Sequence, residues 1–185
     1  MTRKSWPICG LLLLSFVASP ALAQRNVRDP LSEAEVDQMR EAADYPNKRL
    51  ELMIRFAKER IAMIEMLHAD PSSASTRPKQ IHDYLQDFIT LLDETDDNVD
   101  MYASHHSDMR KGLKLLIEAD SEWQLQLRQL KEQSPAEELH EYSFVLANAV
   151  DTVADSAKSA RETLQEQNKL AQDKQLNKVY SERKD

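Results

Sequence analysis

Cysteine and glycine are scarce in this sequence, which has one cysteine and two glycines in 185 residues. The cysteine, Cys9, lies in an N-terminal segment that we expect to be removed, so the remaining chain would have no disulfide and no cysteine metal site. The sequence has neither a phosphate-binding loop nor a nucleophile elbow, because both motifs need glycines at fixed positions. We therefore expect no enzymatic activity and no cofactor.

The sequence also lacks an apolar run of the ~20 residues that a membrane-spanning helix needs. Its longest apolar run, residues 8–18, follows two basic residues and precedes the small-residue sequence Ala21-Leu22-Ala23. That order is typical of a secretory signal peptide, and we predict that residues 1–23 form one. The mature chain of 162 residues would then be exported to the periplasm or the extracellular space. After cleavage we expect no membrane partner.

Positive charge is in short supply. Lys and Arg number 24 against 32 Asp and Glu, and the predicted cleavage removes two basic residues and no acidic one, so the net charge changes from −8 to −10. Nucleic acids and anionic membrane surfaces select proteins with clustered Lys and Arg. We therefore expect no nucleic-acid partner.

The sequence is rich in apolar residues at the three- and four-residue spacing of helices, and it has no alternating pattern typical of strands. Prolines mark the ends of these stretches, and Ser32 with Glu35 predicts a capping box at the start of the first helix. The prediction is a single all-α domain over residues 24–175, with a frayed polar tail at residues 176–185. Its helices would span about residues 31–43, 46–69, 78–133 and 135–175.

The stretch 78–133 decides the predicted shape. It contains no proline after Pro78 and one glycine, Gly112, and its apolar spacing continues without a reset. We favour one continuous helix of ~55 residues, roughly 80 Å long, at the centre of an elongated antiparallel helical bundle or coiled coil. The alternative is a break near the sequence Ser-His-His-Ser-Asp and a compact up-down four-helix bundle. Polar residues on the apolar seam favour that alternative; they are Thr95, His106 and Asp120.

The adjacent histidines His105 and His106 resemble a metal site at first sight. On a continuous helix their side chains diverge by about 100° and cannot share one ion. We expect His106 to pack on the apolar seam beside Tyr102 and Met109, whereas a loop would allow both histidines to converge. The acidic run at residues 93–100 lacks the glycine and the glutamate of a calcium-binding loop, so we interpret it as a solvated helical face.

Two short Glu-x-x-His patterns form a weaker metal hypothesis. Glu65 with His68 and Glu137 with His140 have the spacing that di-iron bundles place on two of their helices. Both pairs fall at predicted helix ends rather than at the middle of a bundle. We interpret them as surface residues and keep a metal-binding helical bundle as the alternative function.

The predicted helix 46–69 has more apolar residues than one neighbouring helix can cover. Beside its main apolar stripe lies a second one, formed by Leu52, Phe56, Met63 and Leu67. Either the helix is buried between two others, or the second stripe contacts another protein or a second copy of the chain. From the sequence we expect an exported, non-enzymatic helical protein that acts through protein contacts, as a scaffold or a holdase-like module, with a homodimer as one form.

Overall fold

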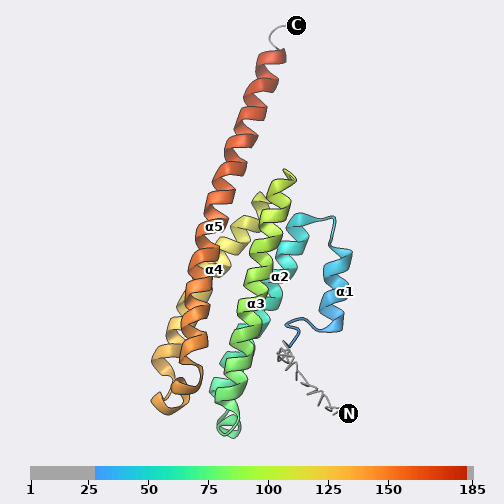
Figure 1. Ribbon diagram of the computed structural model, residues 1–185. Coiled ribbons are helices and arrows are strands. Elements are labelled where there is room, and N and C mark those ends of the chain that lie inside the picture. Colours follow the sequence, from blue (N-terminus) through green and yellow to red (C-terminus); the bar gives the residue numbers. More distant parts are fainter. Residues whose placement is uncertain (1–27, 183–185) are drawn as a thin grey trace, which may run out of the picture.

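The computed structural model describes residues 28–182, with side chains as far as residue 175, and this part of the chain contains helices and no strand. The all-α prediction is confirmed. The predicted signal peptide lies outside the described residues. The elements are α1 (Glu33–Glu41), α2 (Pro46–Ala69), the 3-10 helix η1 (Pro71–Ser73), α3 (Arg77–Ser104), α4 (Arg110–Gln133) and α5 (Ala136–Glu182) (Figure 1).

The predicted continuous helix over residues 78–133 is wrong. Helix α3 ends at Ser104 and α4 begins at Arg110, so the break near Ser-His-His-Ser-Asp that the alternative assumes is the one observed. His106, in the turn between them, has a φ of 55°, in the left-handed region that ends a helix. It is exposed rather than packed on the apolar seam as predicted. The apolar spacing survives the break because both helices bury the face that the spacing defines.

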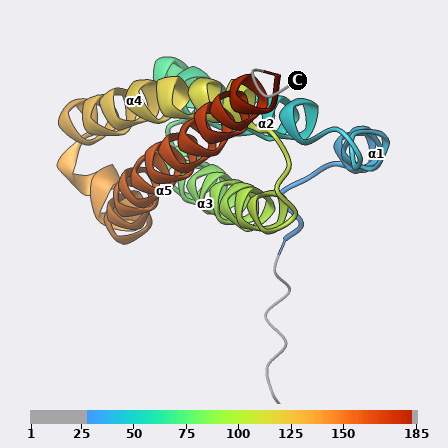
Figure 2. The same ribbon diagram turned by 90° about the horizontal axis from the view of Figure 1, so that it is seen from above.

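Four helices form the bundle: α2 packs against α3 and α4, and α5 packs against the same two helices. Consequently α3 and α4 lie diagonally opposite each other, although they are successive in the chain (Figure 2). The pairs α2–α3 and α4–α5 are antiparallel, as predicted. The pairs α2–α4 and α3–α5 run parallel, which the predicted antiparallel bundle did not include. Two ion pairs between α2 and α4 follow the parallel direction: Glu51 with Lys111, and Lys58 with Glu122.

The turn at residues 105–109 crosses the end of the bundle along that diagonal, and two side-chain amides hold it. From α2, Asn47 donates to the carbonyl of Asp108 and accepts from the amide of Gly112, both at 2.8 Å. From α5, Gln167 donates to the carbonyl of Ser107 and accepts from the amide of Met109, both at 2.9 Å. These amides satisfy backbone groups that a helix break leaves without partners.

Gly112 allows α2 and α4 to approach closely beneath this turn. A Cβ at residue 112 would lie 2.8 Å from Cδ1 and 3.0 Å from Cβ of Leu50, which is fully buried. We expect Gly112→Ala to destabilise the protein by about 1–3 kcal/mol through overpacking, despite the roughly 0.5–1 kcal/mol that alanine adds in helix propensity.

Urea denaturation measures this effect. Ser121→Ala, at an exposed position of the same helix, is the matched control and should leave stability unchanged or slightly higher. If Gly112→Ala were as stable as the wild type, α2 and α4 would not be in contact at this point.

Helix α5 is the longest element, with 47 residues, which corresponds to roughly 70 Å. It continues to Glu182, past the predicted end near residue 175, so the tail predicted to fray is helical as far as that residue. Its C-terminal part projects well beyond the other helices (Figure 1). No helix within residues 28–182 is long and apolar enough to cross a bilayer.

Candidate functional site

The predicted contact stripe on α2 lies largely inside the protein. Phe56 is only 1% exposed and Leu52 is 9% exposed, while Met63 and Leu67 are half-buried. Helix α1 packs against α2, and Met39 of α1 and Ala42, which follows α1, belong to the same buried core. Leu52 and Phe56 are therefore not available to a partner, and the interpretation of α2 as a helix buried between neighbours applies to them.

A buried ion pair fastens α1 to α2. The guanidinium of Arg60 donates to both carboxylate oxygens of Glu35, at 2.8 and 2.9 Å, and also to the carbonyl of Pro30. The capping box predicted for Ser32 and Glu35 is confirmed. Burial by itself raises the pKa of Glu35, but the hydrogen bonds from Arg60 and Ser32 outweigh it and bring that pKa down to about 2.

The four residues of the metal hypothesis lie at one pole of the bundle but do not form a site. Glu65 and His68 belong to α2, whereas Glu137 and His140 are exposed on α5, the diagonally opposite helix. The carboxylate of Glu65 accepts a hydrogen bond from Gln126 of α4 instead.

A cation of the protein itself lies at this pole. Arg77 of α3 donates to the carbonyl of His68 and pairs with Glu138 of α5 at 3.5 Å. Among the residues whose side chains are described, no three His, Cys, Asp or Glu groups converge as metal ligands. The metal hypothesis has no geometric support in this part of the chain.

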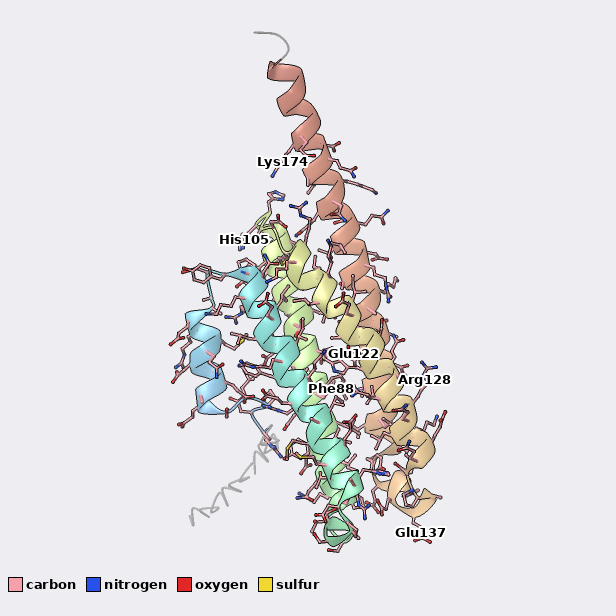
Figure 3. All side chains as sticks on the ribbon, turned by 180° about the vertical axis from the view of Figure 1, so that it is seen from behind. Phe88, His105, Glu122, Arg128, Glu137 and Lys174 are labelled. Carbon is pink, nitrogen blue, oxygen red and sulfur yellow. The ribbon has the colours of Figure 1, made fainter. Side chains whose placement is uncertain are left out.

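The opposite pole has a groove, of about 580 Å³, between the 105–109 turn and the projecting part of α5. Figure 3 labels His105 on the turn and Lys174 on the helix that rises beyond it. Leu170 of α5 lines the groove and is 51% exposed. Four charged residues line the groove together with Leu170; they are Asp108, Arg110, Glu166 and Lys174.

Charge is distributed unevenly between this pole and the rest of the chain. Residues 168–182 of α5 include three Lys and two Asp or Glu, although the protein as a whole is acidic. Along α3, three carboxylates at the spacing of one helix face are exposed: Asp93, Asp97 and Asp100. The prediction of a solvated acidic face is right for these three residues. It is wrong for Asp96, which is partly buried and turned toward α5.

Gln167 lines the groove and its side-chain amide bonds to the turn, so its replacement should lower the stability of the protein. We expect Gln167→Ala to destabilise the protein by about 1–3 kcal/mol, because the buried amide of Met109 loses its acceptor. Faster hydrogen exchange of the Met109 amide and a lower urea midpoint are the expected results. Gln165→Ala, at an exposed position of the same helix, is the control. Equal protection in both variants would contradict this role.

The chain matches no family model, no curated protein and no solved structure. The groove was not predicted from the sequence, because it depends on the turn that replaces the predicted continuous helix. One sequence signal for it exists: a polar residue, Gln167, stands where the spacing of Ala160 and Leu164 calls for an apolar one.

Proposed function

We propose that this is an exported protein without enzymatic activity that acts through protein contacts, as a scaffold or a holdase-like module, at the pole where α5 projects. One observation carries the proposal: Leu170 is half-exposed in a groove at the base of a projecting helix. Interfaces between proteins have an apolar centre and a polar rim, and Leu170 with the charged side chains around it has this arrangement on a small scale. The predicted signal peptide supports export.

The first partner that we propose is a second copy of the chain. In residues 168–182 of the projecting helix three lysines outnumber two acidic residues, and α3 presents the exposed carboxylates of Asp93, Asp97 and Asp100. The projecting helix of one copy is therefore complementary in charge to a face of another copy. Association of this kind weakens as salt screens the charges.

Sedimentation of the mature protein over micromolar to submillimolar concentrations tests the proposal. We expect the average mass to rise with concentration and to fall at high salt. Leu170→Glu should weaken association about tenfold or more, because it places a charge where association would bury an apolar side chain. Leu125→Glu is the matched control, since Leu125 is 52% exposed on α4, outside the groove.

A second measurement covers the holdase-like form of the proposal. The mature protein should suppress the aggregation of a heat-unfolded enzyme, and Leu170→Glu should reduce that effect while Leu125→Glu does not. A monomer at every concentration together with no effect on aggregation would overturn the proposal.

A further inference from the structure

The interior of the bundle contains a carboxyl group without a partner. Asp120 of α4 has 0% of its surface exposed, and among the described residues neither of its oxygens has a hydrogen-bond partner. A buried carboxylate that lacks partners costs several kcal/mol, and such a group usually takes up a proton instead. The surroundings of Asp120 therefore strongly disfavour its ionised form.

Two groups from neighbouring helices lie beside Asp120. Ser156 of α5 is fully buried, and its hydroxyl donates to Oδ1 of Asp96 of α3 at 3.2 Å. A hydroxyl has one proton to donate, so in this arrangement Ser156 has only its lone pairs to offer Asp120. A protonated Asp120 has an O–H that those lone pairs can accept. An ionised Asp120 would compete with Asp96 for the single proton of Ser156.

The surrounding charges also disfavour a second negative charge. Burial raises the pKa of Asp120 most, and the charge of Asp96 raises it further, to about 7, against smaller opposing effects of Arg161 and Ser156 on α5. Burial likewise raises the pKa of Asp96, to about 6, and three more acids of α3 add to it: Asp100, Asp93 and Asp97. From α2, the charged side chains that meet α4 pair at the surface; they are Glu51, Lys58 and Glu65.

We infer that Asp120, Ser156 and Asp96 form a binding site for a single proton that joins α3, α4 and α5 inside the bundle. The proton resides on Asp120, which donates to the Ser156 hydroxyl, and that hydroxyl donates to Asp96. When the proton leaves, two carboxylates face each other in the interior and the contact of the three helices weakens. The bundle is thereby sensitive to pH.

The direction of the effect follows from the raised pKa. The folded protein holds a proton that an unfolded aspartate, with a pKa near 3.8, has already released. The stability that this site contributes is fully present below about pH 4 and is lost as the pH rises through about 7. Above about pH 6, where Asp96 is ionised, the folded state holds one extra proton on Asp120, so the unfolding equilibrium constant should rise about tenfold per pH unit between about pH 6 and about pH 7.

Urea denaturation at stepped pH tests this inference on the mature protein. In Asp120→Asn the side chain is neutral at every pH, so we expect the rise in the unfolding constant between about pH 6 and about pH 7 to be largely abolished. Asp151→Asn removes the same charge from an exposed position of α5 and should retain the wild-type dependence. An unchanged dependence in Asp120→Asn would overturn the inference.

Infrared spectroscopy of the wild type provides a test that does not require a folded variant. A protonated-carboxyl band should be present in the folded protein at about pH 6, where unperturbed carboxyl groups are ionised. The band should disappear as the pH rises above about 8. Absence of the band at about pH 6 would show that no carboxyl group retains a proton, and would overturn the inference even if Asp120→Asn failed to fold.

Discussion

Phe56→Glu is expected to unfold the protein. Phe56 is 1% exposed and lies in the core that α1 and α2 share. Truncation of a buried phenylalanine alone costs about 3–5 kcal/mol, and a buried charge without a partner adds several more. The sum approaches the whole stability of a typical domain, about 5–15 kcal/mol. Far-ultraviolet circular dichroism and urea denaturation measure the loss.

Met63→Glu is the comparison for this result. Met63 belongs to the same stripe but is half-buried, at the edge of the segment that precedes α1. Its new carboxylate can reach water, so we expect a folded protein with moderately reduced stability. If both variants folded and only their self-association changed, the stripe would be an interface between copies, as the sequence predicts in one of its two interpretations.

Arg60→Ala is expected to cost about 3–5 kcal/mol, because it leaves the buried carboxylate of Glu35 without a counter-charge. The side chains of Arg60 and Glu35 are 12% and 10% exposed, so water replaces little of the lost interaction. Urea denaturation gives the total effect, and increased hydrogen exchange within α1 would locate it. Arg40 and Asp37 form an exposed ion pair within α1, so Arg40→Ala should change stability very little.

The double variant Glu35→Leu with Arg60→Met separates the charge effect from packing. Apolar residues of similar volume can replace a buried ion pair without loss, so this variant should recover most of the stability that Arg60→Ala loses. A loss in Arg60→Ala as small as that in Arg40→Ala would indicate that α1 is held by its apolar contacts alone.

Glu35 and Asp120 give the protein opposite responses to pH. The pKa of Glu35 is lowered from 4.5 to about 2, so its contribution to stability is present above about pH 4.5 and is lost as the pH falls through about 2. The contribution of Asp120 is lost in the other direction, as the pH rises through about 7. For these two groups together, stability should be greatest in mildly acidic solution.

Local features of the chain could be predicted from the sequence because they depend on neighbouring residues. The capping box of Ser32 and Glu35 involves residues three apart, and α2 begins at Pro46 and ends at Ala69 as predicted. The polar residues Thr95 and Asp120 on the apolar seam correctly favoured a break in the long helix. These residues alone do not locate the turn, because the spacing of the apolar residues also fits a regular helix that continues through it.

The candidate sites could not be predicted in the same way. The groove depends on Gln167, which contacts residues 107 and 109 only because α5 runs parallel to α3 and passes the turn. The proton site likewise needs three helices, since Asp96, Asp120 and Ser156 are far apart in the chain. The periodicity of each helix indicates which face is buried, but it does not indicate which other helix that face will meet.

By itself, the sequence determined the all-α class, most helix ends and the acidic character of the chain, because helix periodicity, capping and charge are properties of nearby residues and of composition. Tertiary structure decided that residues 105–109 turn, that α3 and α4 lie on a diagonal and that Phe56 is buried. Those outcomes depend on contacts between residues distant in sequence. One example is the pair of amides, Asn47 and Gln167, that makes a helix break stable where no proline requires one.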